Sequence, residues 1–157
     1  MNEGQLNPIQ LMRKINELED KINALKTIQT GGIWTAYTPT WTASTTNPDI
    51  GNGTIAGRYT VIGKVCHVLV YVLAGSTTTA GSGSYSFTYP INPKSLNYVG
   101  GTWLELETGA NIYTGVIYGY SSTFALGVNG ASFVTNLSPF TFADTDFIRA
   151  YLTYEIA

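Results

Sequence analysis

The side chains able to perform nucleophilic or acid–base chemistry are few, and their spacing argues against catalysis. The one cysteine, Cys66, is followed directly by the one histidine, His67. Adjacent residues of a strand point to opposite faces of the sheet, so these two cannot form a catalytic dyad within one chain. We expect Cys66 to be a small buried apolar group and His67 to be an outward or interchain polar residue. One histidine per chain could ligate a metal only on a threefold axis, and we predict neither a metal site nor a cofactor.

Two pairs of carboxylates lie at i, i+2 spacing: Glu105 with Glu107, and Asp144 with Asp146. On a strand such a pair shares one face at a separation of about 7 Å, which glycosidases can use. The first pair belongs to an ordinary alternating strand and the second falls in a predicted turn, so we interpret all four as solvated carboxylates. We therefore predict no catalytic residues, and a polysaccharide-degrading enzyme is the least favoured alternative.

Three tyrosines, Tyr113, Tyr118 and Tyr120, are the candidate ligand-binding residues. They flank a predicted strand that runs into a loop containing Ser121 and Ser122. Aromatic faces beside hydroxyl and amide side chains are suited to sugar rings, and tyrosine is favoured at interfaces in general. Sugar binding is therefore the candidate function of these tyrosines, although packing between chains is the favoured interpretation of them.

The elements that would position these side chains divide the 157 residues into two unlike parts. Eight of the eighteen charged residues lie in the first 30, whereas all twenty aromatic residues follow residue 33. We predict a docking segment at 1–8, a coiled-coil helix at 9–30 and a β-sandwich head at 31–157. The net charge of −2 argues against nucleic-acid binding. The longest apolar stretch, ten residues from Val65 to Ala74, is too short to insert into a membrane.

The first part has the start and stop signals of a helix. Asn7 is placed to cap it, Pro8 suits its first position, Gln10 can complete a capping box, and Gly31-Gly32 ends it. Apolar residues recur at heptad positions a and d, at Leu11, Ile15, Leu18, Ile22 and Leu25. Such a narrow stripe predicts self-association as a short coiled coil, with packing on the chain's own second part as the alternative. Isoleucine at a with leucine at d favours two chains.

The second part is predicted to be mainly β. At the C-terminus, Ile148, Ala150, Leu152, Tyr154 and Ile156 alternate with polar residues, as a half-buried strand requires. Further strands are predicted at 54–61, 65–73, 84–89, 102–107, 112–118, 124–128 and 131–135. About eight short antiparallel strands separated by turn signals indicate a sandwich or jelly-roll-like head.

The segment that leads into the head carries Trp34, Tyr37 and Trp41. We expect them to lock the head onto the helical stalk, with Trp41 in the core. Arg58 is one of only four basic residues in the β part, so we expect it to pair with a specific carboxylate or carbonyl, with receptor contact as the alternative.

The stretch from Pro39 to Tyr59, followed by Ile62-Gly-Lys64 and Gly75-Ser-Thr-Thr-Thr79, resembles a module at the ends of tailed-bacteriophage fibre proteins. The match covers about residues 37–90 and rests on Trp41, Asn47-Pro48, Gly51-Asn52-Gly53, Gly57-Arg58-Tyr59, Gly63-Lys64 and Tyr85–Pro90. Asn52-Gly53 also suits a tight turn with positive φ, and Gly57 indicates a bulge or a close backbone approach. Such fibre proteins are usually trimers in which a short coiled coil leads into a compact β head. The resemblance therefore implies a homotrimer where the heptads favour a dimer, and we adopt three chains.

The resemblance also implies the location and the role. It indicates a non-catalytic virion protein on the tail or capsid surface, made in the host cytoplasm without a signal peptide. Its head would recognise a host-cell receptor, a surface glycan, while residues 1–8 would dock onto other virion proteins. With no collagen-like or β-helical shaft, the chain fits a short fibre, a baseplate-tip protein or a capsid spike. A structural capsid head fibre or decoration protein is the alternative.

Overall fold

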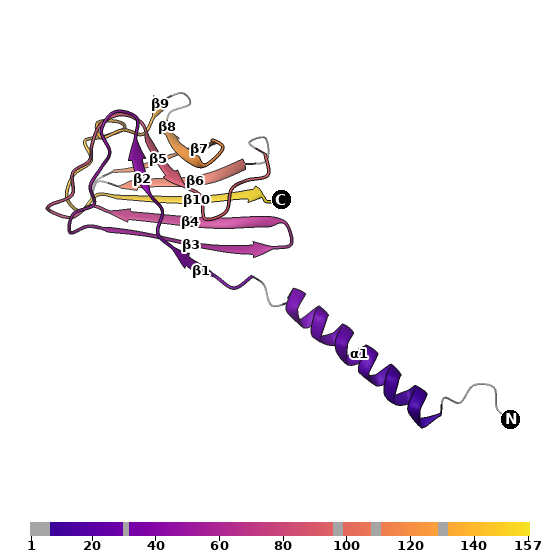
Figure 1. The fold of residues 1–157 in the computed structure, drawn as a ribbon. Helices are drawn as coiled ribbons and strands as arrows, with labels where there is room; N and C mark the ends of the chain where they lie inside the picture. Colours follow the sequence, from indigo (N-terminus) through magenta and orange to yellow (C-terminus); the bar gives the residue numbers. More distant parts are fainter. Residues whose placement is uncertain (1–6, 30–31, 96–98, 108–110, 129–131) are drawn as a thin grey trace. The chain divides into compact units, whose positions relative to one another are not determined.

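A computed structural model describes residues 7–29, 32–95, 99–107, 111–128 and 132–157, with the backbone alone for 26–29 and 99–107. The chain forms two units, Met1–Ile33 and Trp34–Ala157, and we call the second unit the head (Figure 1). The first unit contains the helix α1 (Pro8–Gln29). The head contains β1 (Thr35–Tyr37), β2 (Trp41–Ala43), β3 (Thr54–Ile62), β4 (Val65–Leu73), β5 (Tyr85–Thr88), β6 (Val99–Glu107), β7 (Ile112–Gly119), β8 (Thr123–Val128), β9 (Ser132–Phe133) and β10 (Phe147–Glu155).

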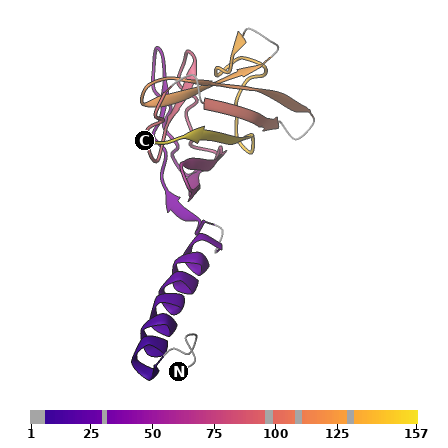
Figure 2. The same ribbon diagram turned by 90° about the vertical axis from the view of Figure 1, so that its right-hand side faces the viewer.

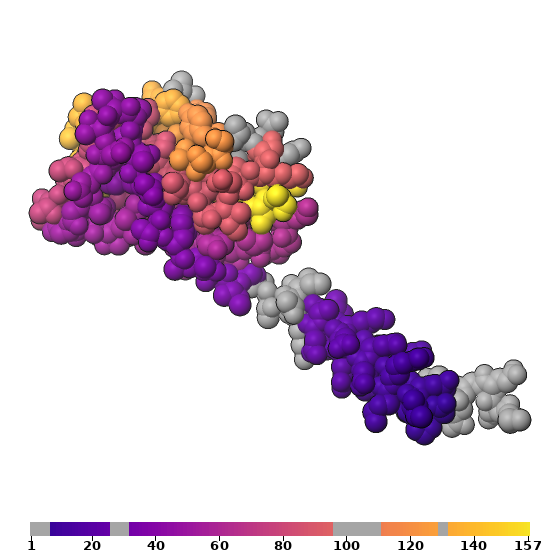
Figure 3. Space-filling model, in the orientation of Figure 1, coloured from indigo at the N-terminus to yellow at the C-terminus, as the bar shows by residue number. Residues whose placement is uncertain are grey.

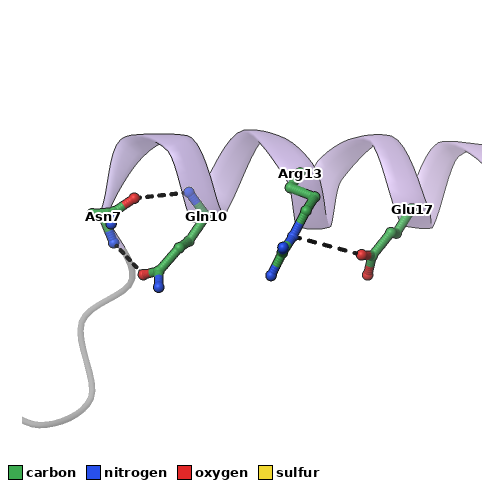
Figure 4. A network of polar contacts seen from close by, with 4 residues as sticks. All are labelled: Asn7, Gln10, Arg13 and Glu17. Carbon is green, nitrogen blue, oxygen red and sulfur yellow. Dashed lines mark hydrogen bonds and ion pairs between the residues drawn. The ribbon is translucent and has the colours of Figure 1, made fainter.

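The start of α1 has the capping box that the sequence predicts. The backbone N–H of Asn7 donates to the side-chain oxygen of Gln10 at 3.0 Å, and the N–H of Gln10 donates to the side-chain oxygen of Asn7 at 2.8 Å (Figure 4). These bonds satisfy donors that a helix start otherwise leaves unpaired. Arg13 and Glu17 form an exposed ion pair one turn further along. Most of the predicted docking segment, residues 1–6, lies outside the described residues.

The heptad residues of α1 form one apolar stripe along the helix. Leu11, Ile15, Leu18, Ile22 and Leu25 are between 42% and 60% exposed in the single chain. Most helical stability in proteins comes from packing of an apolar face rather than from the helix alone. The stripe is therefore the feature of α1 that calls for a packing partner.

The strands of the head form two antiparallel layers that share β7 (Figure 2). Layer 1 has the strand order β1-β3-β4-β10-β6, and layer 2 has the order β7-β8-β5-β2, with β9 beside β8. The first residues of β7 pair with β6, from Ile112 to Thr114, and its later residues pair with β8, from Gly115 to Gly119. The head is thus mainly β, antiparallel and sandwich-like, as the sequence predicts.

Side chains from both layers meet in one core. The buried alternate residues of β4 and β10 in layer 1, such as Val68 and Leu152, belong to the same hydrophobic cluster as Phe87 and Leu126 of layer 2. Trp41 is 7% exposed, and its ring lies 5.0 Å from that of Tyr85 and 6.1 Å from that of Phe87. The predicted place of Trp41 in the core is confirmed.

All eight predicted strands have a counterpart in the structure, and two strands appear that the sequence analysis does not predict. β4 has the predicted bounds, Val65–Leu73, and the predicted strand at 131–135 is reduced to Ser132–Phe133. The two additional strands, β1 and β2, have only three residues each. So short a segment has no detectable alternation, and its pairing with β3 or β5 depends on residues far along the chain.

The residues that carry the fibre-like motif hold two loops together. The Asn52 side-chain oxygen accepts hydrogen bonds from the N–H and the hydroxyl of Thr77 at 2.9 and 3.0 Å, and the N–H of Asn52 donates to that hydroxyl oxygen at 2.8 Å. The tight turn is present, with the Gly53 N–H donating to the carbonyl of Ile50, but the positive φ belongs to Gly51, at 54°, rather than to Asn52-Gly53. The motif therefore has a structural role in joining the loops.

The close backbone approach expected at Gly57 is confirmed, and it makes the glycine hard to replace. Tyr37 is the cross-strand partner of Gly57, and a Cβ on Gly57 would lie 2.4 Å from the Tyr37 ring. We expect Gly57→Ala to displace the Tyr37 ring and to lower the free energy of unfolding by about 1–3 kcal/mol. Urea denaturation measures this loss. Gly63→Ala is an unsuitable control because Gly63 has a φ of 60°, so the exposed Ala56→Ser serves instead.

Candidate functional site

The three candidate tyrosines do not share one surface. Tyr113 is half-buried with its ring 5.4 Å from that of Phe140, and it packs against the core cluster. Tyr118 and Tyr120 are 37% and 44% exposed. Within β7, Tyr113 lies on the same face as the buried Ile117, and Tyr118 lies on the opposite one. The structure therefore separates Tyr113 from the other two and leaves Tyr118 and Tyr120 as surface candidates.

The outer face of layer 2 contains a hollow of about 320 Å³, which we call the hydroxyl hollow. It is lined by Thr42, Ala43, Ser44, Ser84, Ser86, Tyr120, Thr123, Ala125 and Phe133. None of these residues is charged, and five of them carry an aliphatic hydroxyl. In the space-filling view, purple atoms of the segment around β2 and orange atoms of β7 appear on one face of the head (Figure 3).

Strand register explains why a hollow forms at this place. Thr42 of β2 is paired with Ser86 of β5, which is paired with Ala125 of β8, which is paired with Tyr118 of β7. Cross-strand partners point to the same face of a sheet, so these side chains form one row across layer 2. The two central members, Ser86 and Ala125, are small. The outer surface of layer 2 is therefore recessed at Ser86 and Ala125, between larger side chains.

The aromatic rings of Tyr118 and Phe133 lie at one end of this row. The Tyr118 ring lies 5.4 Å from that of Phe133, and a Cβ on Gly127 would lie 2.4 Å from the Tyr118 ring. The backbone N–H of Tyr120 donates to the carbonyl of Thr123 at 2.7 Å, which fixes the short β7–β8 connection. Tyr118 thus packs against Gly127 and Phe133. Tyr120 lies in an ordered turn and lines the hollow.

The sequence analysis does not predict the polar residues of the hollow. Thr42 and Ser86 lie in β2 and β5, and Ser44 and Ser84 lie directly beside these strands. All four are far from Tyr120 in the sequence. The alternation in β5, where Ser86 separates the buried Tyr85 and Phe87, is the one local signal that points to an outward hydroxyl. Which strands lie next to β5 is set by long-range pairing, and no local pattern contains it.

A second, larger hollow of about 470 Å³ lies on layer 1. It is lined mainly by apolar groups, including Ala36, Ala56 and Leu69, and by Arg58 and Arg149. The Arg58 guanidinium lies 5.0 Å from the centre of the Trp34 ring. The expected carboxylate or carbonyl partner of Arg58 is not found among the described residues, and a cation–π contact holds the side chain instead. Trp34 and Tyr37 both contact β3 of the head.

Cys66 and His67 lie on opposite sides of β4, as the alternation predicts. Cys66 is fully buried, and this burial raises the pKa of its thiol, so that the reactive thiolate is disfavoured. His67 is half-buried, with its Nδ1 2.8 Å from the Tyr151 hydroxyl and 3.1 Å from that of Thr153. His67 is therefore a polar residue on the outer face of layer 1, with two hydroxyl groups as its partners.

The prediction of four solvated carboxylates is wrong for Asp146. Asp146 is 6% exposed, and its carboxylate accepts a hydrogen bond from the Ala143 N–H at 2.7 Å, whereas Asp144 is exposed. The carboxylate is buried because it caps the turn that precedes β10, and sequence spacing does not reveal this. The side chains of Glu105 and Glu107 lie outside the described residues. Asp146 therefore has a structural role in this turn.

Burial gives Asp146 a distinct effect on the pH dependence of stability. Desolvation raises the pKa of its carboxyl group in the folded state, so stability from this group is present at low pH and is lost as the pH rises through the folded pKa. We expect Asp146→Asn to remove that loss. In urea denaturation from about pH 3 to pH 7, wild-type stability should fall relative to the variant as pH rises. Parallel curves for the two proteins would contradict this assignment.

Within the described residues no group of three or more His, Cys, Asp or Glu side chains could hold a metal ion, and no described helix is long and apolar enough to cross a membrane. No protein-family model and no solved structure matches the chain.

The chain is similar to a curated phage-derived protein, the Mu-like prophage FluMu defective tail fiber protein of Haemophilus influenzae. The two are 26% identical over 124 residues, which cover 76% of this chain and 20% of the relative. The chain thus spans about a fifth of that protein's length. Over most of its length, the chain is thus similar to part of a phage tail fiber protein.

Proposed function

We propose that the chain is a non-catalytic bacteriophage virion fibre protein whose head binds a glycan receptor on the host surface. The observation that carries this proposal is the similarity to a prophage tail fiber protein over 76% of the chain. The relative's name favours a place on the tail over the alternative of a capsid head fibre or decoration protein. A capsid protein would co-purify with particles that lack tails. Residues 1–8 would dock onto other virion proteins.

The proposed assembly is a homotrimer held by a coiled coil of α1. The exposed a and d stripe supports it, since an a/d repeat with no wider apolar face is typical of helices that pack on one another. Once three helices associate, the three heads stay at high effective concentration. The apolar hollow of layer 1 then offers a surface for contact between heads, which would explain why so few charges occur in the β part.

Receptor binding is assigned to the outer face of layer 2. Tyr118 and Tyr120 are exposed there, beside a row of hydroxyl groups. Tyrosine combines a broad apolar face with a polar end, and both can contact a sugar. We do not include Tyr113 in the proposed binding site, because its side chain packs against the core cluster.

Replacement of both surface tyrosines tests the receptor-binding role. We expect Tyr118→Ala with Tyr120→Ala to abolish binding of fluorescently labelled full-length protein to host cells, as measured by flow cytometry, and to leave the assembled mass unchanged. Ile112→Ala is the control, because Ile112 is 65% exposed on the same strand and does not line the hollow. Unchanged cell binding by the double variant would remove this face as the receptor site.

A further inference from the structure

We infer that the hydroxyl hollow binds one uncharged pyranose ring, with Tyr120 as the stacking residue and the surrounding hydroxyls as hydrogen-bonding partners. This inference rests on the proposed glycan-binding function and specifies the chemical class of the ligand. The contact residues come from four strands of layer 2, which are β2, β5, β8 and β9, and from the connections next to them.

The floor of the hollow is formed by small side chains on regular strands. Ser86 and Ala125 are direct cross-strand partners, and the residues next to them along the strands, Phe87 and Phe124, are fully buried in the core. A ligand that rests on this floor meets backbone held by core packing on the other side of the sheet. Such a floor is formed before the ligand arrives, which lowers the entropic cost of binding.

The polar groups around the floor are hydroxyls. The Thr42 hydroxyl donates to the carbonyl of Ser86 at 3.4 Å, and the Ser44 hydroxyl oxygen accepts from the N–H of Ser84 at 3.0 Å. A hydroxyl can donate one hydrogen bond and accept two, so each of these retains capacity for a ligand. Sugar hydroxyls also donate and accept, so the two sets of groups are complementary.

The aromatic side of the hollow supplies the apolar contact. Tyr120 lines the hollow and is 44% exposed, and Phe133 lines it from β9. The C–H groups on one face of a pyranose present an apolar surface that suits an aromatic ring. A volume of about 320 Å³ lies at the small end of the range for ligand pockets, which fits a single ring better than a long oligosaccharide.

The charge of the lining decides between neutral and acidic sugars. No lysine or arginine lines the hollow, so a carboxylate or sulfate on the ligand would lose hydration without gaining a cationic partner. The arginines of the head that line a hollow, Arg58 and Arg149, belong to the one on layer 1. The hydroxyl hollow should therefore select uncharged sugars.

A matched pair of small sugars tests this inference on the full chain. We expect methyl β-glycosides of glucose, galactose, mannose or N-acetylglucosamine to give saturation-transfer NMR signals, with a dissociation constant of about 1–10 mM for at least one of them. Methyl β-glucuronide, the acidic counterpart of the glucoside, should bind at least tenfold more weakly than the best neutral sugar. Tyr120→Ala and Ser86→Leu should each weaken binding at least tenfold.

Thr114→Leu is the matched control for Ser86→Leu, because Thr114 is an exposed strand residue of β7 that does not line the hollow. The inference is overturned if none of the four neutral glycosides binds, if the glucuronide binds as tightly as the best of them, or if Ser86→Leu behaves like Thr114→Leu. Cell binding separates the two proposals. A protein that binds cells but no neutral glycoside keeps its receptor role and loses this site, and one that binds a glycoside but no host cell loses the receptor role.

Discussion

Placing aspartate at two a positions of α1 should convert the assembled protein into single chains. We expect the variant with Ile15→Asp and Ile22→Asp to have a solution mass of 17.0 kDa by light scattering, against three times that mass for the wild type. The reason is that each aspartate would place a carboxylate in the apolar seam, where three copies of it would repel one another without a cationic partner. Both isoleucines are more than 40% exposed in the single chain and lie outside its hydrophobic core cluster, so the substitutions leave that core intact.

The control for this experiment places the same charges outside the stripe. Asn16→Asp with Ala24→Asp adds two carboxylates to positions b and c of the heptad and should leave the mass unchanged. The near-ultraviolet circular dichroism of the head should be the same in all three proteins. If the stripe variant kept the wild-type mass, the helix would not be the element that holds the chains together.

Removal of the Phe87 ring should be the most damaging single change in the head. Phe87 is fully buried, and its ring lies 6.1 Å from that of Trp41 and 5.8 Å from that of Phe124. We expect Phe87→Ala to lower the free energy of unfolding by about 3–5 kcal/mol, because it removes a large apolar group and leaves a cavity. The total for a domain is about 5–15 kcal/mol, so this loss is a large part of it. Urea denaturation followed by tryptophan fluorescence measures it.

Two further variants show whether the loss comes from the cavity. Phe87→Leu keeps much of the apolar volume and should lose less stability than Phe87→Ala. Thr88→Ser, at the next position of β5 on the opposite face, keeps the hydroxyl that accepts a hydrogen bond from the Thr40 N–H and should have a small effect. A loss below about 1 kcal/mol for Phe87→Ala would mean that the two layers do not pack through this ring as described.

Much of the fold follows from local patterns in the sequence. The alternation of β4 and β10 gives both their positions and their buried faces, because each strand has nine residues and one side in the core. The cap of α1 could be predicted for the same reason, since Asn7 and Gln10 satisfy the backbone groups of their own helix turn. The strands β1 and β2 could not, because their three residues form no pattern and their partners are distant.

The site was predicted less completely than the fold. Tyr113 and Tyr118 are five residues apart in one strand, and an odd spacing puts them on opposite faces. That separation could have been read from the sequence once a regular strand was assumed. The contribution of Thr42 and Ser86 could not, because it depends on the order β7-β8-β5-β2, which brings together strands that are distant in the sequence. The burial of Asp146 also depends on a turn geometry that its neighbours in the sequence do not reveal.

The most direct test of the account is the solution mass of the unaltered full chain, by light scattering on a sizing column. The account predicts three times the 17.0 kDa chain mass, held over a wide range of protein concentration. A mass of two chains would restore the dimer that the heptad pattern favours and would contradict the trimer. A mass of 17.0 kDa would contradict the fibre assembly altogether.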